Sequence, residues 1–125
     1  MKILIAEDDE VSELLFSLTV KDFSKKILNA RTGNEAVEIC KNNPDIDLIL
    51  MDIQMPVKDG IQATKEIRSS SELGNKAQIP IIALTANALV GDRERYLAVG
   101  MTDYLSKPID VAALFAALGR VTARG

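Results

Sequence analysis

Short runs of consecutive apolar residues alternate along this chain with longer segments in which apolar residues recur at helical spacing. Residues 3–6, 48–51 and 81–84 are apolar without interruption. Such runs are typical of strands that are buried on both faces of a parallel sheet. The alternation therefore predicts βαβ units, in which helices connect parallel strands.

Several of the longer segments show the apolar stripe of an amphipathic helix. Apolar residues fall at i, i+3, i+4 and i+7 in the first and last of them: Val11, Leu14, Leu15 and Leu18, and Val111, Leu114, Phe115 and Leu118. Thr32 and Asp59 each stand three residues before a Glu or Gln. This is the spacing of a capping box, so both residues mark a predicted helix start.

The predicted elements alternate between strand and helix. In order, they are a strand at 2–6, a helix at 10–21, a strand at 26–30, a helix at 33–42, a strand at 47–52, a helix at 59–71, a strand at 79–84, a helix at 87–98, a strand at 103–106 and a helix at 110–121. The strands at 26–30 and 103–106 mix polar with apolar residues and fit the sheet edges. We therefore predict an α/β fold, a doubly wound five-stranded parallel sheet in the order 2-1-3-4-5 with five helices. It forms one domain at 1–121, followed by a tail at 122–125.

Composition narrows the choice of function. With 47% hydrophobic residues, the 125-residue chain can fill the core of one domain. The net charge is -3 and no long basic run occurs, which argues against nucleic-acid binding. No apolar stretch is long enough to cross a bilayer, and no signal peptide precedes the first strand. We therefore expect a cytoplasmic protein that makes no membrane contact.

The chain contains no histidine and one cysteine, Cys40. Because histidine is the commonest metal ligand, any metal here has to be held by oxygen atoms. Oxygen ligands select a hard ion such as Mg2+ over zinc or copper. Cys40 falls in a helical pattern, where a small buried residue is expected.

Polar side chains stand where the predicted strands end. They are Glu7, Asp8 and Asp9 after the first strand, Asp52 after the third, Thr85 after the fourth and Lys107 after the fifth. Because the carboxyl ends of parallel strands meet at one edge of the sheet, we expect these groups to converge there.

Such a cluster suits a divalent cation and a phosphoryl group. Carboxylates about 5 Å apart repel by roughly 3 kcal/mol at an effective dielectric constant near 20, so they need a cation between them. Asp52 could hold Mg2+ with one oxygen and attack phosphorus with the other, forming an aspartyl phosphate. Mg2+, Lys107 and Thr85 could then each neutralise one phosphoryl oxygen.

Each residue also has an ordinary structural explanation. Asp9 or Glu10 could cap the first helix, and Thr85 could be an N-cap as well. Lys107 before a proline could be a surface cation. The four matched groups at four strand ends nevertheless favour a shared site.

Four motifs resemble the receiver domain of two-component response regulators, particularly the receivers attached to hybrid sensor histidine kinases. They are Ile3-Leu4-Ile5-Ala6-Glu7-Asp8-Asp9, Leu50-Met51-Asp52-Ile53-Gln54-Met55-Pro56 with Asp59-Gly60, Ala83-Leu84-Thr85-Ala86, and Asp103-Tyr104-Leu105-Ser106-Lys107-Pro108. The resemblance runs from Lys2 to about Leu118 and implies the flavodoxin-like receiver fold. It also implies a role in two-component or phosphorelay signal transduction.

The resemblance implies a role for each strand-end residue. Asp52 matches the phosphoacceptor, Thr85 the switch hydroxyl, Lys107 the lysine that contacts phosphate, and Tyr104 the switch aromatic. Phosphate is expected to draw Thr85 inward, so that Tyr104 turns into the space it leaves. The face formed by the fourth helix, fifth strand and fifth helix would then change shape.

The same resemblance implies the ligands of Mg2+, or of Mn2+ as the alternative ion. Asp8 and Asp52 would bind the ion directly, Glu7 through water, and Gln54 through its backbone carbonyl, with Asp9 as an extra acid. Gln54 and Asn87 would also tune the lifetime of the phosphorylated state. Pro108 would follow Lys107 through a cis peptide bond that aims the lysine into the site.

The predicted function is that of a phosphoacceptor rather than an enzyme, with self-phosphorylation and self-dephosphorylation as its only reactions. The resemblance implies a histidine kinase or a histidine phosphotransfer protein as phosphodonor, and without a histidine of its own the chain cannot be that donor. The weak apolar stripe of the fourth helix, which includes Tyr96, fits an element with two arrangements. The sequence leaves open whether the protein is a monomer or a weak dimer. It also leaves open whether the chain is a free regulator or a receiver taken from a hybrid kinase.

Two other functions use similar chemistry or the same fold. A phosphatase of the haloacid dehalogenase type also forms an aspartyl phosphate, but it places a second aspartate where this chain has Gln54. Its acidic pair follows the nucleophile, whereas here the pair precedes it. A flavodoxin-like carrier would need a Ser/Thr-rich phosphate loop after the first strand, and this chain has acids there.

Overall fold

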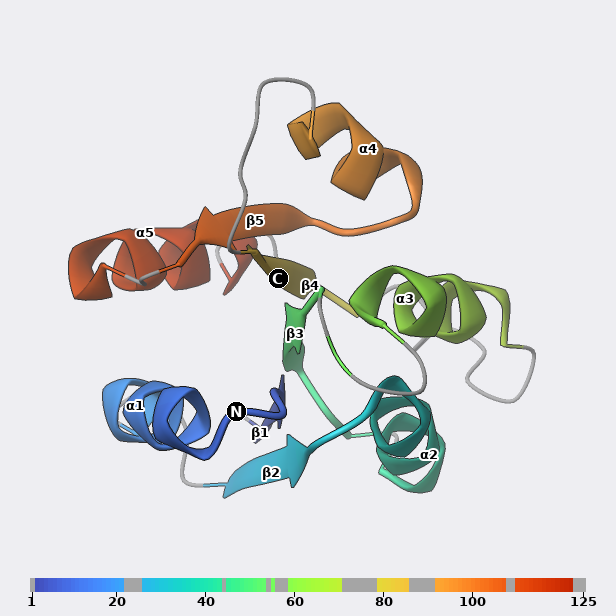
Figure 1. Cartoon of the computed structure of the whole chain (residues 1–125), viewed down its shortest axis with the longest axis horizontal. Coiled ribbons are helices and arrows are strands. Elements are labelled where there is room, and N and C mark those ends of the chain that lie inside the picture. Colours follow the sequence, from blue (N-terminus) through green and yellow to red (C-terminus); the bar gives the residue numbers. More distant parts are fainter. Residues whose placement is uncertain are drawn as a thin grey trace.

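The computed structural model describes residues 2–21, 26–43, 45–53, 55, 59–70, 79–85, 92–107 and 110–122. Five strands and five helices alternate along this part of the chain (Figure 1). The strands are β1 Lys2–Ala6, β2 Lys26–Ala30, β3 Leu48–Asp52, β4 Ile81–Thr85 and β5 Asp103–Ser106. The helices are α1 Glu10–Val20, α2 Gly33–Asn42, α3 Gly60–Ser69, α4 Asp92–Ala98 and α5 Val111–Thr122.

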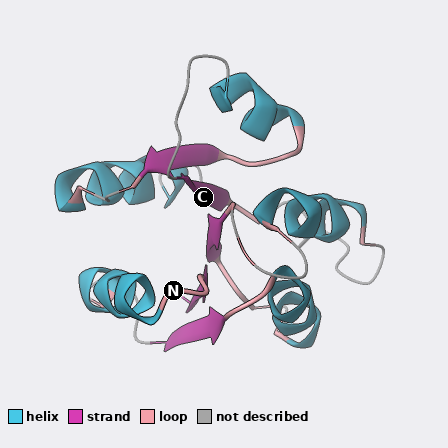
Figure 2. Ribbon diagram, viewed as in Figure 1, coloured by secondary structure: helices cyan, strands magenta, loops and turns pink. Residues whose placement is uncertain are grey.

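The strands form one parallel sheet in the order β2-β1-β3-β4-β5, which confirms the predicted fold class (Figure 2). Every residue of β3 and β4 is buried, whereas the edge strands β2 and β5 keep exposed positions. Neither face of a central strand meets water, which explains why these strands are the uninterrupted apolar runs of the sequence.

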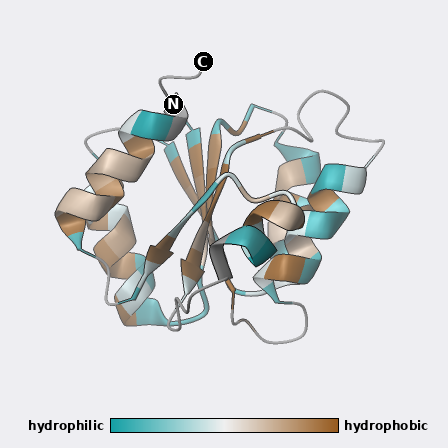
Figure 3. Ribbon diagram, turned by 90° about the horizontal axis from the view of Figure 1, so that it is seen from above, coloured by the Kyte–Doolittle hydropathy of each residue, from teal (hydrophilic) through white to brown (hydrophobic). Residues whose placement is uncertain are grey.

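Side chains of successive strand residues point to opposite faces of the sheet, so two cores form. α1 and α5 cover one core, and α2, α3 and α4 cover the other (Figure 1). The strands at the centre are apolar along most of their length, while the helices show polar and apolar bands (Figure 3). Helices and apolar side chains therefore cover both faces of the sheet.

Helix starts follow the capping signals. The Thr32 side chain accepts from the Glu35 backbone N–H at 3.1 Å, and Asp59 accepts from that of Gln62 at 2.8 Å. These bonds satisfy N–H groups that have no partner in the first helical turn. The helix expected at 87–98 is described only as Asp92–Ala98, since residues 86–91 lie outside the described part.

The apolar stripe of α1 identifies the helix but not the side that packs on the sheet. α1 contacts the core through Phe16 and Val20. The stripe itself faces solvent, with exposed fractions of 75% for Val11, 58% for Leu14, 48% for Leu15 and 53% for Leu18. α5 instead buries Leu114 and Leu118 of its stripe. An exposed apolar face of this kind is typical of a surface that meets a partner.

Candidate functional site

Four predicted site residues stand at the carboxyl-end edge of the sheet. Glu7 follows β1, Asp52 ends β3, Thr85 ends β4 and Lys107 follows β5. Backbone hydrogen bonds extend the pairing beyond the strand ends: the Glu7 N–H donates to the Ala30 carbonyl at 2.9 Å, and the Lys107 N–H to the Thr85 carbonyl at 2.7 Å. Backbone hydrogen bonds thus tie the residues that follow β1 and β5 to the neighbouring strands.

Lys107 joins two buried carboxylates from distant parts of the sequence. Its Nζ lies 3.0 and 3.1 Å from the two carboxylate oxygens of Glu7, and 3.2 Å from Oδ2 of Asp52. The Glu7 and Asp52 side chains are 0% and 4% exposed, and that of Lys107 is 24% exposed. Lys107 is therefore not a free surface cation but the positive charge of this site.

Three acids form a cluster that could hold a metal ion. One carboxylate oxygen each from Glu7, Asp8 and Asp52 lies within 4.8 Å of the others. Asp8 is exposed, so the cluster opens to solvent on its side. Three oxygen donors with an open side fit a hard cation such as Mg2+, which keeps waters and admits phosphate oxygens.

Burial makes this cluster electrostatically unfavourable without a cation. The pKa of Glu7 is raised from 4.5 to about 8, first by burial and then by its hydrogen bond and repulsion with Asp52, which outweigh the attraction of Lys107. Burial alone would lower the pKa of Lys107, but its contacts with Glu7 and Asp52 raise it overall. Burial and the neighbouring Asp52 thus favour the protonated form of Glu7, while the two carboxyl groups favour the charged form of Lys107.

Asp9, the third consecutive acid, is the N-cap of α1. Its Oδ2 accepts from the Ser12 hydroxyl at 2.7 Å and from the Ser12 backbone N–H at 3.0 Å. These hydrogen bonds hold the pKa of Asp9 below its usual value. The structural explanation for Asp9 is therefore confirmed, and Glu7 and Asp8 are the acids of the cluster.

Gly60 lets the chain pass close to Asp52. Its N–H donates to the Ile53 carbonyl at 3.0 Å. A Cβ at this position would collide with the backbone carbonyl oxygen of Asp52. A residue without a side chain is needed here, because α3 begins directly against the end of β3.

Tyr96 of α4 is a site neighbour that the sequence did not reveal. It is 3% exposed, and its hydroxyl donates to Oγ1 of Thr85 at 3.1 Å. Its ring also lies 6.2 Å from that of Tyr104, centroid to centroid. The only signal in the sequence is an aromatic hydroxyl in the helix after Thr85, and the weak stripe of that helix concealed which residue faces inward.

Three further predictions fall outside the described residues. They concern Gln54 as a metal ligand and tuning residue, Asn87 as a tuning residue, and Pro108 after Lys107. Tyr104 is described, half-buried on β5 beside Tyr96. In the described part of the chain, no helix combines the length and the apolar character that crossing a membrane requires.

Known proteins are similar to this chain in sequence and in fold. Residues 3–119 match the family model described as "Response regulator receiver domain". Over 110 residues the chain is 40% identical to the signal transduction histidine-protein kinase BarA of Escherichia coli K12, a match that covers 88% of this chain and 12% of BarA. The chain therefore spans about an eighth of that relative.

Two solved structures are similar as well. The receiver domain of sensor histidine kinase PA1611 from Pseudomonas aeruginosa, with magnesium coordinated in its active site cleft, is 41% identical with a TM-score of 0.82, covering 95% of this chain and 94% of that one. The Ssk1 receiver domain of Saccharomyces cerevisiae, solved with the histidine phosphotransfer protein Ypd1, is 33% identical with a TM-score of 0.84, covering 95% and 86%.

These matches confirm the predicted resemblance to receivers of histidine kinases, and none of the three relatives is a haloacid dehalogenase phosphatase or a flavodoxin. They extend over both cores and over each strand end that carries a site residue. The chain belongs to the response regulator receiver domain family.

Proposed function

We propose that this domain takes a phosphoryl group onto Asp52 from a phosphohistidine of a partner protein. The observation that carries the proposal is the buried Asp52 carboxylate, 3.2 Å from the Lys107 ammonium and next to two more acids. A carboxylate in this position has a cation beside it and an opening to solvent through Asp8. It can therefore act as a nucleophile toward a phosphoryl group.

In the proposed step, a carboxylate oxygen of Asp52 forms a bond to phosphorus as the phosphorus–nitrogen bond of the donor breaks. The donor imidazole keeps the electron pair of that bond and takes up a proton from solvent. Lys107 leaves its contact with Glu7 to neutralise one phosphoryl oxygen, and Thr85 donates its hydroxyl to another. In-line placement and neutralised oxygens are the main requirements of phosphoryl transfer.

Asp8 and Asp52 would bind Mg2+ directly and Glu7 through water, with the Gln54 carbonyl as a further ligand and Mn2+ as the substitute ion. When bound, the ion supplies positive charge to the phosphoryl oxygens. The magnesium site of the PA1611 receiver supports this assignment. Metal binding also gives a reason for three acids to share one partly buried site, which is otherwise costly.

The exposed stripe of α1 is the surface that we assign to the phosphodonor. α1 begins two residues after Asp8, so a partner that reaches Asp52 from the open side passes over this helix. Val11, Leu14, Leu15 and Leu18 offer it an apolar face. The Ssk1 receiver bound to a histidine phosphotransfer protein supports a donor of that class or a histidine kinase.

The rest of the proposal concerns the output and its setting. Phosphorylation draws Thr85 inward and Tyr104 follows, which changes the face formed by α4, β5 and α5. Gln54 and Asn87 set the lifetime of the aspartyl phosphate. The domain extends over residues 1–121. It acts in the cytoplasm, where ATP phosphorylates the donor kinase. It is a phosphoacceptor and turns over no separate substrate.

Intact-mass measurement tests the acceptor. Incubation with acetyl phosphate and Mg2+ should add one phosphoryl group to the wild type and none to Asp52→Asn. Asp45→Asn, which removes an exposed acid at the opposite end of the sheet, is the matched control and should be labelled normally. Equal labelling of Asp52→Asn would contradict the assignment.

A second measurement tests the donor surface. Leu14→Glu places a charge on the exposed face of α1 without disturbing the core, since Leu14 is 58% exposed. Transfer from a phosphohistidine-loaded phosphotransfer domain should slow by on the order of tenfold. Labelling by acetyl phosphate should not change, because so small a donor needs no docking surface. Slower labelling by both donors would indicate damage to the site instead.

A further inference from the structure

Tyr96 connects α4 directly to the switch hydroxyl. Its Oη donates to Oγ1 of Thr85 at 3.1 Å, and the contact is buried. We propose that Tyr96 is a positioning residue that holds the Thr85 hydroxyl on the α4 side of β4 while Asp52 is unphosphorylated. Tyr96 has this role only if phosphate on Asp52 recruits Thr85, as set out under the proposed function.

Tyr96 is fixed in place by its surroundings. Its side chain belongs to the core cluster on the α2, α3 and α4 face of the sheet. The Tyr104 ring lies beside it at a tilt of 51°, and the Arg95 guanidinium lies 5.9 Å from its ring centre. The Met101 N–H donates to the Tyr96 carbonyl at 3.1 Å, just beyond the turn at Gly100. The hydroxyl therefore cannot swing out to solvent without moving α4.

Threonine changes its hydroxyl direction in discrete steps, because its branched side chain prefers a few staggered rotamers. In one position Oγ1 of Thr85 accepts from Tyr96. Donating to a phosphoryl oxygen on Asp52 requires Oγ1 to turn toward the end of β3, which is hydrogen-bonded to β4 at this level. A hydroxyl can accept one hydrogen bond and donate another at the same time, so the contact with Tyr96 and the contact with phosphate compete for the position of Oγ1 and not for its hydrogen-bonding capacity.

Loss of the Thr85 contact leaves a buried tyrosine hydroxyl without that partner, which is unfavourable until the helix moves. Because Tyr96 and Tyr104 are in ring contact, the same movement reaches β5. Tyr96 thus opposes activation, and it links the movement of α4 to β5.

A double-mutant cycle tests this coupling, with beryllofluoride and Mg2+ as a stable mimic of the phosphoryl group. The measured quantity is the beryllofluoride concentration that gives half-maximal change in amide NMR shifts at Leu97 and Leu105. Tyr96→Phe removes only the hydroxyl and should lower this concentration about two- to tenfold, the effect of one net hydrogen bond. In unliganded Tyr96→Phe, the two shifts should move part of the way toward their values in the saturated wild type.

The cycle is closed in a Thr85→Ala background. There Tyr96→Phe should change nothing, because the competing hydroxyl is already absent. An equal effect with and without Thr85, or a Tyr96→Phe domain that binds beryllofluoride no better than the wild type, would overturn the role of Tyr96. A wild type that shows no response to beryllofluoride would instead overturn the proposed function, and with it this role.

Discussion

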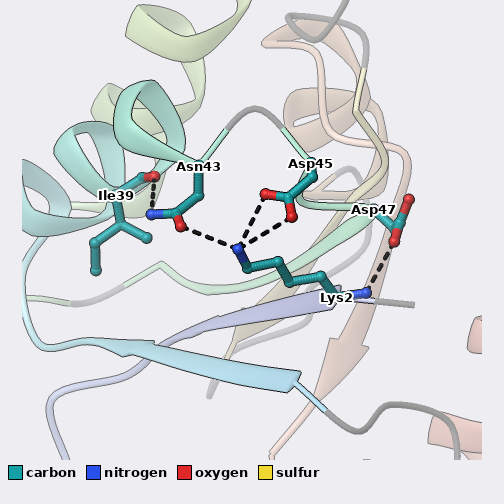
Figure 4. A network of polar contacts seen from close by, with 5 residues as sticks. All are labelled: Lys2, Ile39, Asn43, Asp45 and Asp47. Carbon is teal, nitrogen blue, oxygen red and sulfur yellow. Dashed lines mark hydrogen bonds and ion pairs between the residues drawn. The ribbon is translucent and has the colours of Figure 1, made fainter.

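The two ends of the sheet carry similar residues in opposite environments. At the amino end, Nζ of Lys2 contacts Asp45 at 3.0 and 3.2 Å and Asn43 at 3.0 Å (Figure 4). Asp47 accepts from the Lys2 backbone N–H at 2.8 Å. The Asp45 side chain is 65% exposed, so water solvates whatever charge Lys2 does not neutralise. The hydrogen bonds with Lys2 hold the pKa of Asp45 below its usual value.

At the carboxyl end, one lysine faces three acids, and two of these are buried. Here the pKa of Glu7 is raised to about 8, chiefly by burial, whereas the pKa of Asp45 at the amino end is lowered. The difference teaches that a lysine among carboxylates is not by itself a functional sign. Burial and an uncompensated charge distinguish the carboxyl-end site, because both make a bound cation favourable.

The largest expected effect comes from the two lysines, exchanged one at a time for alanine. Lys107→Ala removes a cation that is preorganised for the phosphoryl oxygens, so phosphorylation of Asp52 by acetyl phosphate should slow on the order of 100-fold. Its Mg2+ affinity should stay largely intact, since Lys107 contacts phosphate and not metal. Lys2→Ala at the other end should leave the rate unchanged. Stopped-flow or mass-based rates would check both, and weak Mg2+ binding with a normal rate in Lys107→Ala would reverse the assigned role.

The next effect concerns the metal. Asp8→Asn removes a direct ligand, so the dissociation constant for Mg2+ should rise tenfold or more, about 1.4 kcal/mol. Asp47 is an exposed acid at the amino end of the sheet, so Asp47→Asn should bind Mg2+ as the wild type does. Calorimetric or NMR titration measures both variants. Equal losses of Mg2+ affinity in the two variants would mean that the ion is attracted by the overall negative charge of the domain and does not bind at the cluster.

A smaller effect appears in the pH dependence of stability without metal. The pKa of Glu7 is raised on folding, so below pH 4.5, where Glu7 is protonated in both states, its contribution to stability is fully present. Between about pH 4.5 and pH 8 the unfolded state loses the Glu7 proton first, and this contribution is lost. Glu7→Gln cannot titrate, so its Tm should exceed that of the wild type by at least about 3 °C at pH 8.

Mg2+ separates this electrostatic cost from a simple change in packing. At pH 8, saturating Mg2+ should raise the Tm of the wild type more than that of Glu7→Gln, because the ion relieves the repulsion that the variant lacks. Differential scanning fluorimetry from pH 5 to pH 8 would show the curves diverging. Parallel curves would mean that folded Glu7 is already ionised at pH 5, as it is in the unfolded chain, and that folding does not raise its pKa.

The smallest effect is expected at the amino end. Lys2→Met removes the ion pair with Asp45, whose carboxylate is 65% exposed, and ion pairs that water reaches contribute little to stability. The Tm should change by no more than a few degrees, with no difference between samples with and without Mg2+. A large loss of stability would show that the two ends are more alike than their burial suggests.

Much of the fold followed from the sequence, because the central strands are uninterrupted apolar runs and the edge strands are not. The convergence of Glu7, Asp52 and Lys107 followed from strand order, since carboxyl ends of neighbouring parallel strands meet. The roles of Asp52, Thr85, Lys107 and Tyr104 stay predictions.

The rest depends on packing that no local pattern encodes. The stripe of Val11 and Leu14 predicted a helix, yet the sheet packs against Phe16 and Val20. The contact between Tyr96 and Thr85 joins residues across a connection whose path sequence periodicity does not specify. Helix orientation about its own axis is decided by the fit of side chains against the sheet, which a stripe alone does not determine.

The most direct test is to locate the phosphoryl group by chemistry. After reaction with acetyl phosphate and Mg2+, borohydride reduces an aspartyl phosphate to homoserine, which peptide mass spectrometry identifies at a single position. We expect homoserine at residue 52 and none at residues 45 or 47, with no conversion when Mg2+ is removed. Conversion at the amino-end acids, or conversion at residue 52 without any divalent ion, would contradict the account of the carboxyl-end site.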